Sequence, residues 1–193
     1  MRLMVANLPR LLRTSITSRG LKARRPALFD DHRETRVAAQ LELLEILLAT
    51  LGETPGRLRA LLAGVDPALL TRPAVDGGWS VAQNIAHMCA VESPYHARLV
   101  RLALEDNPRM AAIGSTTGEY DPETPASILA DTFADLRART VAFLQTLSPL
   151  AYSRPGVHAE LGPGTLRSQV EALLRHDENH LAYLAGAMGR EGK

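Results

Sequence analysis

A C-terminal run of apolar residues spaced three and four apart constrains the fold more than any other part of the chain. On a helical wheel of about 100° per residue that starts at Leu166, the apolar residues of this run fall within about 60° of zero. They are Val170, Leu173, Leu181, Leu184 and Met188. A stripe of this width predicts a helix that buries one face. Thr165 is the predicted N-cap, and we expect the helix to end near Gly189.

Three further segments show the same helical spacing of apolar residues. They lie at about residues 33–63, 81–105 and 125–147. The second follows the sequence SVAQ at Ser80, a capping box that starts helices. Gly52 and Pro55 predict a kink or short break in the first. Only 4% of the 193 residues are aromatic, whereas 46% are hydrophobic, and Leu and Ala dominate these, which favours helix over sheet.

The segments between the predicted helices are rich in proline and glycine, which marks them as loops. The longest begins at about Asp106 and ends at about Glu123. A chain of this length is most simply one domain. We therefore predict an all-α fold, a four-helix bundle over residues 33–189 with a long crossover between helices two and three. Residues 1–32 are expected to form a basic, poorly ordered extension.

The charge of the chain is unevenly distributed. Residues 1–29 hold seven of the 22 basic residues and no acid, so the rest of the chain has 15 basic against 21 acidic residues. An acidic bundle argues against nucleic-acid binding there. The basic segment lacks the run of apolar residues that a secretory signal contains. No apolar stretch in the sequence is long enough to span a membrane. With a single cysteine, Cys89, this predicts a cytoplasmic protein. The alternative is that the basic segment directs the bundle to nucleic acid or membrane.

Two histidines and an aspartate lie on or beside the apolar stripe of the C-terminal helix. His180 and His176 lie about 40° and 80° to one side of zero, and Asp177 lies at about 20°, inside the stripe. Histidines four residues apart on a helix have Cβ atoms about 5–6 Å apart, close enough to bind one metal ion. A buried carboxylate needs a polar partner. For Asp177 we expect that partner to be the second ring nitrogen of a metal-bound histidine.

The helix over residues 81–105 repeats this arrangement. On a wheel that starts at Val81, Glu92 falls at about 20°, inside the apolar stripe, and His87 at about 240°, on its edge. Each of the two helices thus carries a histidine on the edge of its apolar stripe and a carboxylate inside the stripe. This shared arrangement predicts that the two helices form one site together. Its expected metal ligands are His87, His176 and His180. Glu92 is expected nearby as ligand, base or buried partner.

Two stretches of the sequence resemble the DinB/YfiT-like superfamily. The run GGWSVAQNIAHMCAVE (residues 77–92) resembles the second helix of that family. The runs GVHAELGPGTL (residues 156–166) and LLRHDENHLAYL (residues 173–184) resemble its last loop and fourth helix. The resemblance extends over about residues 37–188. It implies a four-helix bundle with a long crossover after the second helix.

The resemblance also implies a divalent metal ion, zinc or nickel, on His87, His176 and His180. His158 stands at a position that is often histidine in relatives, and we expect it near the mouth of the pocket. At Tyr183 the sequence departs from the family pattern, in which a polar residue such as glutamine often follows the last ligand. Tyr183 is expected either to reach the metal site or to pack at the end of the bundle.

The family includes thiol S-transferases that use bacillithiol or mycothiol, and proposed metal-dependent hydrolases. An ion held by three imidazoles keeps an open position, where it can activate water or hold a thiolate. We therefore expect a metal-dependent thiol S-transferase or hydrolase acting on a small molecule, with Glu92 as general base. A transferase would use a low-molecular-weight thiol as cosubstrate. The alternative is a non-catalytic helical bundle that binds a ligand or partner, with the metal structural. The oligomeric state is open, with a homodimer as one candidate.

Overall fold

The computed structural model describes residues 30–74, 77–119 and 121–189. Most of the predicted basic extension, residues 1–32, lies outside the described residues, so its role stays a prediction. Contacts between residues divide the chain after Arg36 into two units. The second unit begins at Val37 and holds the helical bundle apart from the first residues of its first helix.

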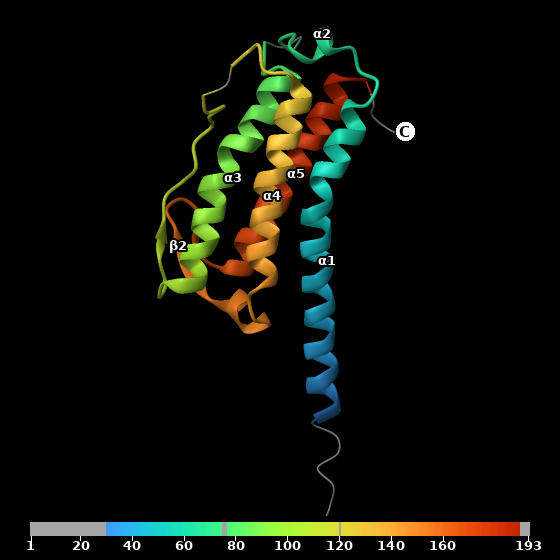
Figure 1. The fold of residues 1–193 in the computed structure, drawn as a ribbon. Helices are drawn as coiled ribbons and strands as arrows, with labels where there is room; N and C mark the ends of the chain where they lie inside the picture. Colours follow the sequence, from blue (N-terminus) through green and yellow to red (C-terminus); the bar gives the residue numbers. More distant parts are fainter. Residues whose placement is uncertain (1–29, 75–76, 120, 190–193) are drawn as a thin grey trace, which may run out of the picture. The chain divides into compact units, whose positions relative to one another are not determined.

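Within the described residues, four long helices make up the bundle and confirm the predicted all-α architecture. They are α1 (Asp30–Leu62), α3 (Val81–Leu104), α4 (Ala126–Gln145) and α5 (Leu166–Ala187). Figure 1 shows α3, α4 and α5 side by side, and the chain between α3 and α4 runs as a long crossover along the outside of α3. The starts of α3 and α5 are as predicted, and the other helix limits differ from the predicted ones by one to three residues, because helix ends are the least sharply encoded part of a helix.

Capping boxes set the first turns of the two helices that carry the predicted site. Ser80 Oγ accepts from the Gln83 amide at 3.1 Å, and Gln83 Oε1 accepts from the Ser80 amide at 2.9 Å. At the start of α5, Thr165 Oγ1 accepts from the Ser168 amide at 3.2 Å, and Ser168 Oγ accepts from the Thr165 amide at 2.9 Å. These bonds satisfy amides that lack a helical partner. They also fix where each helix begins, and therefore which face its later residues occupy.

Helix α1 continues through Gly52 and Pro55, where a kink or short break is predicted. Proline has no N–H, so Pro55 leaves the carbonyl of Leu51 without its usual partner four residues later. That carbonyl instead accepts from Nη1 of Arg137 on α4, at 3.2 Å. A tertiary hydrogen bond thus replaces the missing helical one. This helps to explain why α1 continues past Pro55 instead of breaking there.

The connections hold short elements that the sequence pattern does not predict. Among the described residues these are α2 (Pro67–Leu70), the 3-10 helix η1 (Pro149–Ser153) and the strands β1 (Arg109–Met110), β2 (Pro155–His158) and β3 (Gly162–Thr165). The strands form one sheet in the order β1-β2-β3, with β1 parallel and β3 antiparallel to β2. Strands this short, and with proline and glycine in them, carry no alternating pattern that would reveal them.

Gly156 allows this sheet to lie close against the end of α3. A Cβ atom at this position would lie 2.4 Å from Leu102 Cδ2 and 3.2 Å from the Pro108 carbonyl oxygen. Only glycine leaves room for that approach. The sheet thereby ties the start of the crossover to the segment that leads into α5.

Two apolar clusters fill the bundle. One comprises Leu58, Leu70, Val81, Ala82, Ile85, Met88, Ala126, Ala130, Phe133, Leu181 and Leu184. The other comprises Leu47, Leu51, Leu99, Leu102, Met110, Leu144, Tyr152, Leu166, Val170 and Leu173. On α3, α4 and α5 the two clusters occupy opposite ends of the helix. The turns between them carry buried polar side chains.

The centre of this polar layer is an arginine that bonds to two carboxylates. Arg137 of α4 donates from Nε and Nη2 to the two oxygens of Glu92 on α3, at 2.9 and 2.8 Å. It also donates from Nη1 and Nη2 to the two oxygens of Asp177 on α5. All three side chains are 1% exposed. With the Leu51 carbonyl of α1, this one guanidinium contacts all four long helices.

Such a cluster is stable only if every charge keeps its partner, because buried ions lose their hydration. Burial by itself lowers the pKa of Arg137, but its bonds to Glu92 and Asp177 raise that pKa above the ordinary value. Burial likewise raises the pKa of Asp177, whereas His176 and Arg137 lower it, and the result is a pKa below the ordinary value. The guanidinium and the Asp177 carboxylate therefore both stay ionised.

No helix in the described part of the chain combines the length and the apolar character that crossing a membrane requires.

Replacing Arg137 with methionine should strongly destabilise the fold. The change leaves Glu92 and Asp177 buried without a counter-charge, and we expect the free energy of unfolding to fall by about 3–5 kcal/mol. The matched control is Arg59→Met, which removes an exposed ion pair with Asp131 and should cost about 0–1 kcal/mol. Urea unfolding followed by circular dichroism measures both. Equal losses in the two variants would contradict the central role of Arg137.

Candidate metal centre

The three histidines predicted from the helical wheels lie together. Each of His87, His176 and His180 offers a ring nitrogen, and these three atoms lie within 4.8 Å of one another. Nε2 of His87 is 3.1 Å from Nε2 of His176. Nitrogen ligands at about 2.0–2.1 Å in a tetrahedral site lie about 3.3 Å apart. The spacing of this pair therefore matches two ligands of one ion.

The helices position the three rings. His176 and His180 occupy successive turns of α5, and their ring centroids are 4.4 Å apart. His87 approaches from the second turn of α3, with its ring centroid 5.2 Å from that of His176 and 4.9 Å from that of His180. The Trp79 ring, just before α3, lies 4.9 Å from the His87 ring and covers it on one side.

Oxygen atoms lie within hydrogen-bond distance of Nδ1, the opposite nitrogen, in two of the rings. Nδ1 of His87 is 2.6 Å from the carbonyl oxygen of Thr116 in the crossover, and Nδ1 of His180 is 3.0 Å from Oδ1 of Asn84. The Thr116 carbonyl oxygen can only accept. Asn84 Oδ1 is also an acceptor, because the Asn84 amide nitrogen donates to the Trp79 and Ser80 carbonyls at 3.3 and 3.0 Å. The proton of each ring then lies on Nδ1, which leaves Nε2 with its lone pair for a metal.

Asp177 takes the corresponding place beside His176, though less closely. Its Oδ1 is 3.6 Å from His176 Nδ1, which is an ion-pair distance and too long for a hydrogen bond. Among the described residues this Nδ1 is buried and has no hydrogen-bond partner. The expected role of Asp177 in orienting a metal-bound histidine stays a prediction, and its firm partner is Arg137.

The protonation states of the rings suit metal binding. Burial lowers the pKa of His180 to about 4, with help from the neighbouring His176 and His87. Burial also lowers the pKa of His87. These two rings are therefore neutral at pH 7, and each can offer an Nε2 lone pair to a cation. The donor set fits a divalent ion such as zinc or nickel, and three protein ligands leave a position open.

A cavity of about 280 Å³ borders this centre. His87 and His176 form part of its wall, and the predicted pocket residue His158 forms another part. The remaining wall is Val91, Tyr95, Arg98, Ala112, Ile113, Gly114, Ser115 and Glu160. The cavity is large enough for a small ligand beside the histidines.

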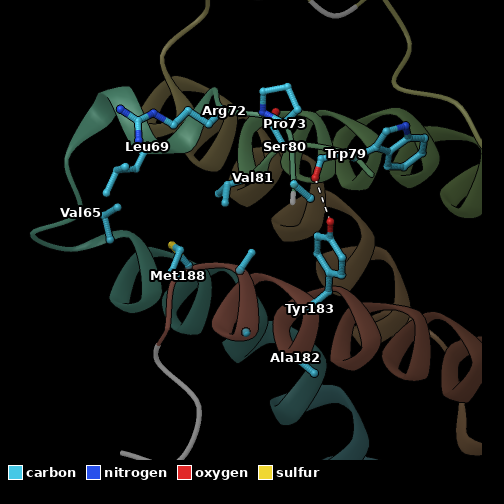
Figure 2. Close-up of a pocket in the computed structure, with 13 residues that line it drawn as sticks. Val65, Leu69, Arg72, Pro73, Trp79, Ser80, Val81, Ala182, Tyr183 and Met188 are labelled. Atoms are coloured by element: carbon cyan, nitrogen blue, oxygen red, sulfur yellow. Dashed lines mark hydrogen bonds between the residues drawn. The ribbon is translucent and has the colours of Figure 1, made fainter. Parts of the chain in front are cut away.

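Tyr183 lines a different cavity, of about 750 Å³, together with Leu69, Val81 and Met188. Figure 2 shows its hydroxyl, which donates to the Trp79 carbonyl oxygen at 3.0 Å. This bond ties α5 to the residue that precedes α3. Of the two roles expected for Tyr183, the geometry favours packing at the end of the bundle.

Glu92 is not among the groups that the structure brings to the three histidines. Both of its oxygens accept from Arg137, and its side chain is 1% exposed. It does not line the 280 Å³ cavity. Its role as general base stays a prediction, and its observed contacts are those of a buried partner, one of the three roles expected for it.

Sequence reasoning missed Asn84, Tyr95, Arg98 and Thr116. Three of them carry a readable signal, because on the wheel that starts at Val81 they lie on the same side of α3 as His87. Asn84 falls at about 300°, Tyr95 at about 320° and Arg98 at about 260°. Thr116 carries no such signal, because its carbonyl meets His87 only through the path of the crossover.

Comparisons with known proteins agree with this geometry. A family model described as DinB superfamily matches residues 50–184. A Geobacillus kaustophilus protein named "putative metal-dependent hydrolase" is 26% identical over 153 residues, which are 75% of this chain and 84% of that protein. An Oceanobacillus iheyensis protein with the same description is 26% identical over 117 residues, 60% of this chain and 68% of its own length.

A solved structure shares the fold. It is YfiT from Bacillus subtilis, described as "a probable metal-dependent hydrolase with an unusual four-helix bundle topology". The TM-score is 0.68 at 22% sequence identity, and the match covers 77% of this chain and 87% of YfiT. At that identity the likeness concerns the fold alone.

Changing Asn84 to leucine should weaken metal binding without removing a ligand. The leucine cannot accept from Nδ1 of His180, so the ring loses the bond that orients it. We expect zinc affinity to fall by about 10- to 100-fold. Asn84→Asp keeps the acceptor oxygen for His180 but loses the amide donors to the Trp79 and Ser80 carbonyls, so its affinity should lie between those of wild type and Asn84→Leu. Competition with a chromophoric chelator measures both, and wild-type affinity in Asn84→Leu would contradict this role.

Proposed function

The chain belongs to the DinB superfamily, and from that premise we propose that it is a metal-dependent hydrolase of a small-molecule substrate, with His87, His176 and His180 as ligands of a divalent ion. The proposal is supported chiefly by one observation. Three imidazoles from two helices converge, and Nδ1 of two of them faces a fixed oxygen acceptor. Two relatives named as metal-dependent hydrolases add to that support.

The chain's own residues prepare the centre in three ways. The Thr116 carbonyl and Asn84 hold two rings in the tautomer that presents Nε2. Trp79 covers His87 on one side, while the 280 Å³ cavity leaves His87 and His176 accessible on another. An ion bound there supplies Lewis-acid chemistry, activating water for attack and polarising a substrate carbonyl. Zinc and nickel both suit an all-imidazole donor set.

A thiol S-transferase is the second candidate, because the same centre can hold a thiolate from a low-molecular-weight cosubstrate. The chain's own thiol does not fit that role. Burial raises the pKa of Cys89 to about 12, and its Sγ donates to the Leu129 carbonyl at 3.3 Å. A thiolate nucleophile would therefore have to come from outside the chain. A homodimer and a cytoplasmic location remain predictions.

Replacing His176 with alanine should remove the metal and the activity together. We expect wild type to hold about one zinc or nickel ion per chain and to hydrolyse members of a panel of small esters and amides. His176→Ala should lose the bound ion and at least about 100-fold in kcat/KM. The matched control is His96→Ala, since His96 contacts Thr140 and Phe143 instead of the centre. Metal is measured by mass spectrometry of the purified protein.

Three results decide between the candidates. Turnover only when a thiol and an electrophile are added together would favour the transferase. Bound metal that raises the melting temperature, with no turnover on either panel, would favour a non-catalytic bundle with a structural metal. Wild-type protein without stoichiometric metal would refute the proposed centre itself.

Glu92→Gln separates catalysis from folding. Because both Glu92 oxygens accept from Arg137, we expect the free energy of unfolding to fall by about 1–3 kcal/mol. The turnover of the folded, metal-loaded variant should stay within about threefold of wild type, because Glu92 does not line the 280 Å³ cavity. Loss of a general base typically costs about 10²-fold or more. Urea unfolding and kcat per bound metal are the two measurements. A loss of about 100-fold in kcat at full metal content would instead identify Glu92 as the general base.

A further inference from the structure

A second buried arginine lies in the wall of the cavity beside the histidines. Arg98 of α3 is 6% exposed, and it borders the same 280 Å³ space as His87 and His176. Its Nη1 donates to Gln169 Oε1 at 3.2 Å, and its Nη2 donates to the Ala111 carbonyl at 2.6 Å. Both of these acceptors are neutral.

Arg98 differs from Arg137 in what balances its charge. Arg137 bonds to two carboxylates. In the described part of the chain no carboxylate lies within ion-pair distance of Arg98. Burial lowers the pKa of Arg98, and the neighbouring Tyr95 partly offsets this. Glu160 lines the cavity but is exposed. A buried cation without a counter-ion is costly, so the position of Arg98 has a cost that a bound anion would offset.

The surroundings of Arg98 leave it able to bind a ligand. A guanidinium has five N–H donors and stays protonated in proteins, and the bonds to Gln169 and Ala111 use two of the five. Its Cζ lies 4.8 Å from the centroid of the Tyr95 ring, so the guanidinium makes a cation–π contact with that ring. The Tyr95 ring is in turn 6.4 Å from that of His176, so one ring separates the arginine from a candidate metal ligand.

His158 adds a second donor to the same wall. Its Nδ1 accepts from the amides of Glu160 and Leu161, at 3.2 and 3.3 Å. An imidazole that accepts at Nδ1 carries its proton on Nε2. His158 lines the cavity, and Nε2–H is the polar group that these bonds leave available to a ligand. Val91 and Ile113 make the neighbouring wall apolar.

We propose that Arg98 is a specificity residue that binds a carboxylate of the substrate, while the reacting group of the same molecule faces the three-histidine centre. The substrate class is thus a small carboxylic acid with an apolar part that contacts Val91 and Ile113. This inference rests on the proposed function, because it assigns the substrate of that centre. The planar fork of arginine matches a carboxylate with two parallel hydrogen bonds.

The test compares a charged probe with a neutral one of the same shape. Benzoate and benzamide are titrated by calorimetry into the full chain as purified, in wild type and in Arg98→Met. We expect wild type to bind benzoate more tightly than benzamide. In Arg98→Met the benzoate Kd should rise by about 10- to 100-fold, the usual range for a lost charge-assisted hydrogen bond, while the benzamide Kd changes by less than about threefold.

Two further variants serve as controls for the charge and for the position of the arginine. Arg98→Lys keeps the charge and should lose less benzoate affinity than Arg98→Met, even if the methionine variant folds poorly. Arg101→Met removes an exposed arginine of the same helix that pairs with Glu105, and it should bind benzoate as wild type does. Thermal melting and metal content are recorded for each variant, and the metal content should not change.

The comparison of four affinities separates this proposal from the hydrolase. A carboxylate that binds only to the metal would lose no affinity in Arg98→Met, and that result overturns the proposal. So does an equal loss for benzoate and benzamide, or no preference for benzoate in wild type. Turnover plays no part in the measurement, so failure of the proposed hydrolysis and failure of carboxylate binding are seen in different experiments.

Discussion

The buried guanidinium of Arg137 is the contact on which the arrangement of the bundle depends. It bonds to Glu92 on α3, to Asp177 on α5 and to the Leu51 carbonyl on α1. Hydrophobic packing brings helices together but is not directional, so it tolerates rotation and sliding. A fork of hydrogen bonds between charges buried at 1% exposure tolerates neither. We infer that this cluster sets the register in which the helices meet.

The same register places the three histidines. Asp177 bonds to Arg137, and the residue before it, His176, is a metal-ligand candidate. His87 lies just over one turn before Glu92 on α3. Any shift of α3 against α5 that separated His87 from His176 would also break the bonds to Arg137. The ion cluster therefore stabilises the relative position of the two helices that carry the histidines. A site on rigid helices that are stabilised in this way keeps its geometry.

The crossover contributes to the site as well as to the topology. Its Thr116 carbonyl orients His87, its Ala111 carbonyl accepts from Arg98, and its residues 112–115 wall the cavity. The small sheet anchors this segment at β1 beside β2, where Gly156 permits close approach to α3. The helices thus supply the three ring nitrogens, while the crossover and the strand bearing His158 shape the space in front of them.

The sequence by itself determined the helices, the bundle and the three histidines, because a period of about 3.6 residues places each polar side chain on a known face of its helix. It also showed that Glu92 and Asp177 point inward. Only the tertiary structure decided their partner. Arg137 lies on α4, and neither carboxylate is near it in the sequence, so a helical wheel cannot show which cation meets which acid. The wheel equally could not show that the carbonyl freed by Pro55 accepts from that arginine, or that a loop carbonyl orients His87. These contacts depend on how separate elements meet in space, which no local pattern encodes.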